Sequence, residues 1–278
     1  MRPRIVEALN GVFDTTIFAF LIPDPAFVYA LAIGVCAWLF VRRTKEAGLS
    51  QYHALGGVIW GVIGGFVGAR FFFLATHYER VIYNYSMLFD LNGATVSWGA
   101  YLGGTIAFLA YFRLKNTSPL TYLDVVASCL GLGICVARWS CFLNGDDFGT
   151  LSTAPWAVAF PHGSYPFAAQ VKLALVDALA PRSLPIHPVQ IYGSLKGLLL
   201  FAVFTYLWRR NHLPPGILFC LLWMAFATLR FGLEFFRGDV SRGFVGLLST
   251  GQVMSLVIFG VCGIVVASQL VRKRMLAL

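Results

Sequence analysis

The stretch "LTYLDVVASCLGLGICVARWSCFLNGDDFG", residues 120–149, joins a long apolar run to a strongly polar end. Residues 120–142 are long enough to cross a lipid bilayer, because a membrane-spanning helix needs about 20 mostly apolar residues. Arg138 lies inside this run, and Asn144, Asp146 and Asp147 follow it directly. An ionisable group inside a span costs about 2.5 kcal/mol or more and usually faces a partner or a cavity. The stretch therefore predicts a transmembrane helix that ends in a polar site.

The composition extends this interpretation to the whole chain of 278 residues. Hydrophobic residues make up 58% of the sequence and charged residues 12%, whereas soluble domains carry about 25% charged residues. The net charge of +9 comes largely from short basic clusters beside apolar segments. Such clusters are typical of topology signals, and they argue against a nucleic-acid-binding surface. The predicted fold class is all-α, a polytopic integral membrane protein.

Apolar segments of sufficient length predict about seven spans. Basic residues follow the first, third, fifth and seventh of them, and since such residues are enriched in cytoplasmic loops, we expect the N-terminus outside and the C-terminus in the cytoplasm. The expected spans are 25–42, 54–75, 94–113, 120–142, 188–208, 215–235 and 247–270.

The parts outside the spans are expected to be few. Residues 1–24 have roughly helical spacing of apolar residues and are predicted to form an outer-surface arm. Residues 25–278 form the membrane domain, which includes an outer-face lobe at 143–187. Proline, glycine and aromatic residues in 143–187 indicate an ordered lobe rather than a linker.

Polar residues of separate spans are predicted to share one layer in the outer leaflet. At about 1.5 Å per residue, Arg138 lies about 27 Å along the fourth span and Arg230 about 22 Å along the sixth, both from the cytoplasmic side. Other spans begin or end at the same level, at Arg70, Trp98, His187, Gln190 and Tyr192. This convergence favours one shared site.

The segment "LRFGLEFFRGD" places Arg230, Glu234 and Arg237 on one helical stripe. An intrahelical ion pair that lowers the cost of insertion is one interpretation of this stripe. With Arg138 and Arg70 at the same level, an anion site is the other, because guanidinium groups bind phosphate through a fixed fork of donors. The anion that the outer leaflet offers is a phospholipid head group.

Glycine and cysteine residues are predicted to serve packing. Gly57, Gly61 and Gly65, and likewise Gly64 and Gly68, repeat at four-residue spacing, which allows close helix approach. The cysteines lie in apolar segments without a C-x-x-C pair, so packing is favoured over a metal site or disulfides. The sequence indicates no metal and no cofactor.

Several motifs of the chain occur together in one family of bacterial inner-membrane enzymes. "ARWSCFLNGDDFG" matches the pattern G-R-x-G-N-F-x-N-x-E-x-x-G at Arg138, Phe142, Asn144 and Gly149, with Asp146 for the glutamate. Further matches are "GAR" at 68–70, "HPVQIY" at 187–192, "RFGLEFFR" at 230–237 and "GQ" at 251–252. The chain thus resembles the prolipoprotein diacylglyceryl transferases over nearly its whole length.

The resemblance implies an enzyme with seven spans in the bacterial inner membrane and an active site toward the outer leaflet. Its reaction moves a diacylglyceryl group from phosphatidylglycerol to the lipobox cysteine of a prolipoprotein and releases glycerol phosphate. The implied catalytic residues are Arg138, Arg230, Glu234, Asn144 and Asp146. The implied substrate-binding residues are Arg70, Tyr29, Trp98, Gly149, His187, Gln190, Tyr192 and Arg237.

The chain also departs from the family pattern. Trp98 stands where the family has a histidine proposed as the catalytic base, and Cys141 replaces an asparagine of the signature. Phe226 and Gly193 stand where a tyrosine and a glutamate are common. Because tryptophan cannot exchange a proton near neutral pH, His187, His162 and Asp147 are candidates for the missing base.

Three functions remain open at this point. The first is transfer to a prolipoprotein cysteine, and the second is transfer from the same phospholipid to another acceptor. The third is phospholipid binding without turnover. In the first, we expect Asp146 to hold Arg138, and Glu234 to orient Arg230 or Arg237.

Overall fold

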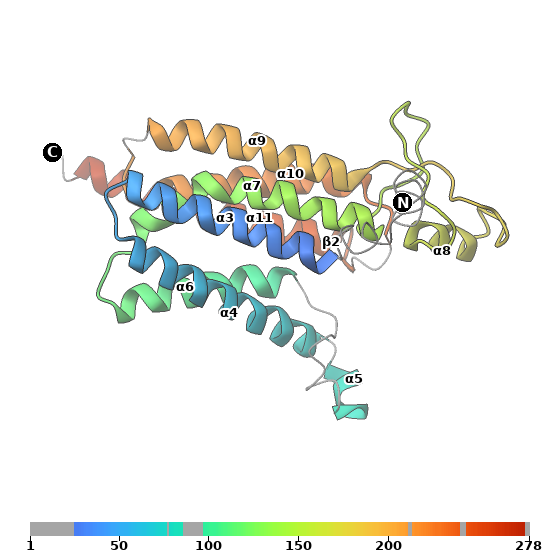
Figure 1. Cartoon of the computed structure of the whole chain (residues 1–278), viewed down its shortest axis with the longest axis horizontal. Coiled ribbons are helices and arrows are strands. Elements are labelled where there is room, and N and C mark those ends of the chain that lie inside the picture. The colour runs from blue at the N-terminus through green and yellow to red at the C-terminus, as the bar shows by residue number, and fades with distance from the viewer. Residues whose placement is uncertain (1–24, 77, 86–96, 211–212, 240–242, 276–278) are drawn as a thin grey trace, which may run out of the picture. The chain divides into compact units, whose positions relative to one another are not determined.

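The computed structural model describes residues 25–76, 78–85, 97–210, 213–239 and 243–275. The predicted arm at 1–24 lies outside these residues. The chain divides into two compact units, one formed by Ala37–Val125 and the other by the chain up to Cys36 together with Val126–Leu278. Figure 1 labels the elements of both units.

Long helices form most of the described chain, which confirms the predicted fold class. Six of them are long and apolar enough to span a membrane: α3 (Pro25–Glu46), α4 (Gln51–Thr76), α7 (Leu120–Asn144), α9 (Val189–Arg209), α10 (Ile217–Leu233) and α11 (Thr250–Met275). The predicted span at 94–113 corresponds to α6 (Ser97–Leu114), an 18-residue helix that is not among these six. The seven-span count and the orientation of the termini stay predictions.

Short elements connect the long helices. They are α5 (Tyr78–Tyr83), α8 (Tyr165–Lys172), the 3₁₀ turn η2 (Glu234–Phe236), and the antiparallel strands β1 (Phe244–Val245) and β2 (Leu248–Ser249). The lobe at 143–187 contains α8 and closes on itself, since Ile186 forms β-bridges with both Leu151 and Val158. Phe160 and Ile186 of the lobe pack with Phe142 of α7 in a small buried core.

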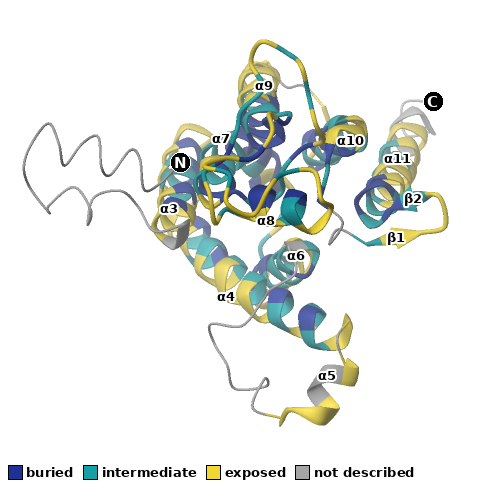
Figure 2. Cartoon of the chain, turned by 90° about the vertical axis from the view of Figure 1, so that its right-hand side faces the viewer, coloured by how far each residue is buried: buried dark blue, intermediate teal, exposed yellow. Residues whose placement is uncertain are grey.

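The larger unit is built around the packing of α7, α9 and α10. Ala127 of α7, Leu200 and Phe204 of α9, and Leu222 and Phe226 of α10 form one buried cluster. The other faces of the long helices stay exposed, and most of α11 beyond its first turns is drawn in the colours of exposed and intermediate residues in Figure 2. Exposed apolar side chains on long helices are expected where lipid is the solvent.

Glycines bring α4 and α6 into backbone contact within the smaller unit. A Cβ atom on Gly68 would meet the carbonyl oxygen of Gly99 and would lie 2.9 Å from Cα of Gly103. Gly61, on the same helix, has only the carbonyl oxygen of Gly104 near it, at 3.8 Å. The predicted close approach is thus present, and it depends on Gly68 more than on Gly61.

The pair offers a test of this packing. Gly68→Ala forces α4 and α6 apart, and overpacking of this kind costs about 1–3 kcal/mol. We expect it to lower the thermal midpoint of the purified protein in detergent. Gly61→Ala adds the same methyl group at ordinary contact distance and should not lower the midpoint, because alanine is favoured over glycine inside a helix. Equal midpoints for both variants would contradict this account.

Candidate functional site

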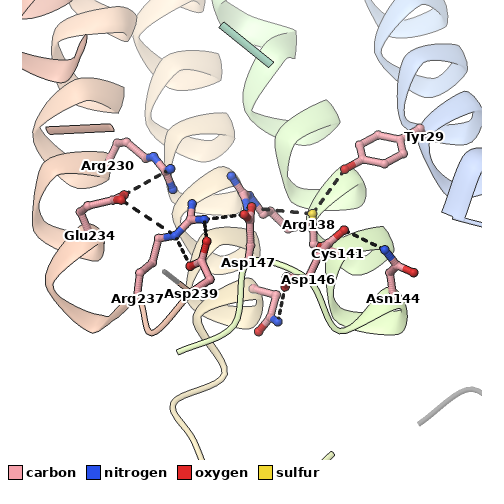
Figure 3. A network of polar contacts seen from close by, with 11 residues as sticks. Tyr29, Arg138, Cys141, Asn144, Asp146, Asp147, Arg230, Glu234, Arg237 and Asp239 are labelled. Atoms are coloured by element: carbon pink, nitrogen blue, oxygen red, sulfur yellow. Dashed lines mark hydrogen bonds and ion pairs between the residues drawn. The ribbon is translucent and has the colours of Figure 1, made fainter. Parts of the chain in front are cut away.

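The centre of the site is a carboxylate, that of Asp147, held between two arginines (Figure 3). Its Oδ2 accepts a hydrogen bond from Nη1 of Arg138 at 2.6 Å, and its Oδ1 accepts one from Nη2 of Arg237 at 2.6 Å. Arg138 belongs to α7, Asp147 follows that helix, and Arg237 follows α10. One side chain therefore ties the ends of two membrane helices together.

The backbone after α7 explains why Asp147 reaches back to Arg138. Gly145 has φ +81° and ends the helix, and Asp147 has φ +50°. Left-handed conformations are easiest for glycine and are tolerated by aspartate. Gly149 then pairs with Arg237 in an antiparallel bridge. The chain after α7 is thereby fixed to the chain after α10.

The charge of the two arginines dominates the titration of Asp147. Burial alone would raise the pKa of this carboxyl, but Arg138 and Arg237 outweigh it and lower the pKa to about 2. For Arg237, burial would lower the pKa, whereas its hydrogen bonds to Asp239 and the charge of Asp147 raise it above the ordinary value. All three groups therefore stay ionised at neutral pH.

Arg237 and Arg230 share a second set of carboxylates. Arg237 donates to both oxygens of Asp239, from Nε at 2.8 Å and from Nη2 at 2.6 Å. Glu234, only 2% exposed, lies 3.2 Å from Nη2 of Arg230 and 3.9 Å from Nε of Arg237. The expected stripe of Arg230, Glu234 and Arg237 is therefore present. A Cβ atom on Gly251 of α11 would lie 2.9 Å from Oε2 of Glu234.

Asp146 occupies a different place from the one expected. The carboxylate that pairs with Arg138 at 2.6 Å is that of Asp147, whereas Oδ2 of Asp146 accepts a hydrogen bond from Nδ2 of Asn144 at 2.9 Å. Burial raises the pKa of Asp146, and the Asn144 hydrogen bond opposes this shift. Gln190 of α9 donates from Nε2 to the backbone oxygen of Asp146 at 2.7 Å. These contacts fix the turn that carries Asp147.

The structure shows the neighbours of two residues that depart from the family pattern, Cys141 and Gly193. The thiol of Cys141 does more than pack, because its Sγ lies 3.3 Å from the Tyr29 hydroxyl and 4.0 Å from Nη1 of Arg138. A Cβ atom on Gly193 would lie 2.9 Å from Cδ of Arg138. The small residue at 193 therefore gives the Arg138 side chain its space.

An aromatic group lies beside the charged network. The Tyr192 hydroxyl hydrogen-bonds to Nδ1 of His187 at 3.1 Å and accepts a bond from Nε1 of Trp156 at 2.6 Å. The Phe236 ring packs edge-on against His187, with ring centroids 5.3 Å apart. Gly149 faces the His187 backbone, where any side chain would meet the His187 carbonyl oxygen.

Two of the predicted site residues are not among the contacts described above. Arg70 and Trp98 belong to the smaller unit, where the Arg70 guanidinium lies over the Phe73 ring and Trp98 packs edge-on against Tyr101. Their convergence with Arg138 stays a prediction. All the other predicted site residues belong to the larger unit.

Sequence reasoning missed Asp239 and Lys196, and it treated Asp147 only as a candidate base. Asp239 stands two residues after Arg237, and this separation brings two side chains to one side only where the chain is extended. The helical pattern of residues 230–237 did not indicate an extended chain there. Lys196 is a lysine in an apolar span, and that feature alone is a recognised sign of function.

The site can stabilise an anion. Arg138 and Arg230 keep 19% and 14% of their side chains exposed, against 6% for Arg237. Guanidinium groups held by carboxylates in a water-poor site present charge that needs no reorganisation when an anion binds. Developing negative charge on a phosphate leaving group is one such anion.

Comparison with known proteins agrees with this chemistry. The family profile described as prolipoprotein diacylglyceryl transferase matches residues 16–268. A phosphatidylglycerol–prolipoprotein diacylglyceryl transferase of Clostridium tetani is 32% identical over 228 residues, which cover 81% of this chain and 85% of that protein. The enzyme of the same name from Idiomarina loihiensis is 32% identical over 81% of this chain and 79% of its own. The enzyme named phosphatidylglycerol–prolipoprotein diacylglyceryl transferase 2 of Clostridium perfringens is 29% identical over 92% of this chain and 91% of that protein. The chain belongs to the prolipoprotein diacylglyceryl transferase family.

Proposed function

We propose that this protein transfers a diacylglyceryl group from phosphatidylglycerol to the cysteine thiol of a prolipoprotein lipobox and releases glycerol phosphate. The relatives named above carry this donor and this acceptor in their names. The single observation that carries the proposal is the arginine cluster of Arg138, Arg230 and Arg237 at the ends of membrane-spanning helices. A phospholipid phosphate is the anion that fits such a place.

The reaction is a displacement at the glycerol carbon that bears the phosphate. The thiol sulfur forms a bond to this carbon, the carbon–oxygen bond breaks, and its electron pair goes to the departing phosphate monoester. The thiol proton is balanced by the phosphate, which leaves as its monoanion. Cations positioned at the leaving phosphate lower the barrier because its negative charge grows in the transition state.

The three arginines have different roles in stabilising the leaving phosphate. Arg138 and Arg230 are the more exposed, so we assign them to the phosphate. Arg237 is committed to Asp147 and Asp239 and is assigned to positioning. Glu234 positions Arg230, and Asn144, Asp146 and Gln190 position the turn behind Asp147.

The thiol must lose its proton without the family histidine. Asp147 is a poor base, since its pKa lies at about 2. A substrate thiol that enters beside Arg138 meets a positive field, and nearby cations lower the pKa of a thiol from its usual value of about 8.5. We assign thiol activation to this field, with His187 and Tyr192 lining the approach from the lobe.

The protein is proposed to lie in the bacterial inner membrane with this site toward the outer leaflet. The support is the distribution of basic residues, which lie in the last turns of α3, α6 and α9. In α9 this end lies opposite the site, because the site is at the beginning of that helix. The lobe at 143–187 connects α7 to α9 at the site end. It is therefore the part that a prolipoprotein arriving from outside would meet.

The direct test is incubation of the purified protein with phosphatidylglycerol and a lipobox peptide, followed by mass spectrometry of the peptide and phosphate analysis. Diacylated peptide together with stoichiometric glycerol phosphate is the expected result. Consumption of lipid without modified peptide would favour another acceptor. Bound phospholipid that never turns over would favour the non-catalytic alternative, and both outcomes would overturn the proposal.

Two arginine variants test the anion site. Arg138→Ala and Arg230→Ala each remove a cation assigned to the leaving phosphate, and we expect a loss of transfer of about a hundredfold or more. Arg209→Ala, which removes an exposed arginine at the end of α9, is the matched control and should keep parental activity. Near-normal turnover by both site variants, at equal membrane yield, would refute the anion-site assignment.

Asp147→Asn tests the central pair through its pH dependence. The folded pKa of Asp147 is lowered to about 2, below the value of about 3.9 for an unfolded aspartate. The stability from this group is therefore complete above about pH 5 and is lost as the pH falls through 2. We expect the thermal midpoint of Asp147→Asn to lie below that of the parent by a constant difference from pH 5 to pH 8.

The same difference should shrink below about pH 4, because the unfolded parent chain then begins to bind a proton at Asp147, while the folded carboxylate stays ionised until the pH approaches 2. Asp177→Asn changes an exposed aspartate whose Oδ1 accepts a hydrogen bond from the Leu179 backbone, a bond that asparagine can also accept. It serves as the control and should match the parent throughout. A difference that varies between pH 5 and pH 8 would contradict the assignment of the charge to Asp147.

A further inference from the structure

Lys196 of α9 lies inside the larger unit although it belongs to an apolar span. It is 6% exposed and lies about 10 Å along α9 from Val189, at about 1.5 Å per residue. Arg138 lies about 9 Å before the end of α7 at Asn144 by the same rise. The two cations are therefore at similar depth from the site end of their helices.

Close helix packing holds Lys196 in this position. Gly193 and Gly197, four residues apart, share one face of α9, and Lys196 is a surface neighbour of Gly193 three residues further along the helix. A Cβ atom on Gly193 would lie 2.9 Å from Cδ of Arg138, and one on Gly197 would lie 2.6 Å from the backbone nitrogen of Cys135 in α7. The glycine face of α9 beside Lys196 thus abuts α7 at the level of Arg138, while the Lys196 ammonium lies against Phe226 of α10.

The ammonium group of Lys196 differs from the arginines of the site in its partners. Within the described residues, no carboxylate lies within ion-pair distance of it, and its Nζ lies 4.0 Å from the centroid of the Phe226 ring. Arg138, Arg230 and Glu234 are the charged groups that act on it electrostatically. Glu234 already pairs with Arg230 at 3.2 Å.

A buried cation without a carboxylate is costly. A cation–π contact offsets only a small part of the cost of taking an ion out of water. A hydrocarbon side chain of similar volume would fill the same place more stably. The burial of Lys196 is explained if an anion binds to its ammonium group while the protein functions.

We propose that Lys196 is a third cation for the phosphate of the phospholipid donor, beside Arg138 and Arg230. This assignment rests on the proposed function and names a further residue for it. The ammonium donates to a phosphate oxygen of bound phosphatidylglycerol and remains with the glycerol phosphate as the carbon–oxygen bond breaks. Its role is thus to bind the donor and to stabilise the leaving group, while bond making and breaking follow the balance given above.

The test compares Lys196→Met with Lys196→Arg and with Lys45→Met, which removes an exposed lysine in the last turn of α3. Two arms measure the shift in thermal midpoint on adding phosphatidylglycerol in detergent or free sn-glycerol 1-phosphate. A third arm measures kcat and KM for transfer to a lipobox peptide. Using both phosphate sources shows whether the lysine binds the head group within the lipid or the released product.

We expect Lys196→Met to lose the midpoint shift with both phosphates and to transfer about ten- to a hundredfold more slowly, the loss expected for a charge-assisted hydrogen bond. Its midpoint without ligand should equal or exceed that of the parent, because the unpaired buried charge is gone. Lys196→Arg should recover part of the shift and rate, and Lys45→Met should behave as the parent. A purely structural role predicts the opposite, a lower unliganded midpoint.

Full midpoint shifts and parental turnover in Lys196→Met would overturn the proposal. If that variant is not recovered from membranes, Lys196→Gln, which is neutral and polar, replaces it with the same expectations. If the parent binds phosphatidylglycerol but modifies no lipobox peptide, the proposed function fails. The midpoint shifts then still decide whether Lys196 binds phosphate.

Discussion

The ion pairs of Asp147 with Arg138 and Arg237 are the constraint on which the rest of the site depends. Each joins the carboxylate to an arginine from a different membrane helix or its end, at 2.6 Å. The same contacts decide which cations stay available, since Arg237 also binds Asp239 while Arg138 and Arg230 remain more exposed. Burial of three guanidinium groups alone would be unfavourable. A small set of carboxylates stabilises them.

Small residues make this arrangement of charges possible. Gly193 leaves room for the Arg138 side chain, Gly251 lets α11 approach the Glu234 carboxylate, and Gly149 lies against the His187 backbone. A side chain at position 193 would occupy the space that the stem of Arg138 fills. With a glycine there, Arg138 can reach Asp147 as its partner.

The sequence predicted the helices well because hydrophobic length determines them. The expected span at 120–142 is α7 at Leu120–Asn144, and the expected span at 215–235 is α10 with its 3₁₀ extension. The Arg230–Glu234 pair was also predictable, because residues four apart share a helical face. Which of two adjacent aspartates turns toward Arg138 was not, since the left-handed backbone at Gly145 and Asp147 decides it. Asp239 was missed because it lies in irregular chain beyond the helix end, where the sequence shows no repeating pattern.

The order of the helices in the larger unit has a consequence for any anion that binds there. By connectivity, α7 and α10 end at the site, whereas α3, α9 and α11 begin there. The peptide dipoles of the first two present partial negative charge, and those of the other three present partial positive charge. These backbone fields oppose one another and each amounts to about half a charge, so ionised side chains dominate the electrostatic potential at the site. The affinity for an anion should therefore change with each arginine, lysine or carboxylate group that is added to the site or removed from it.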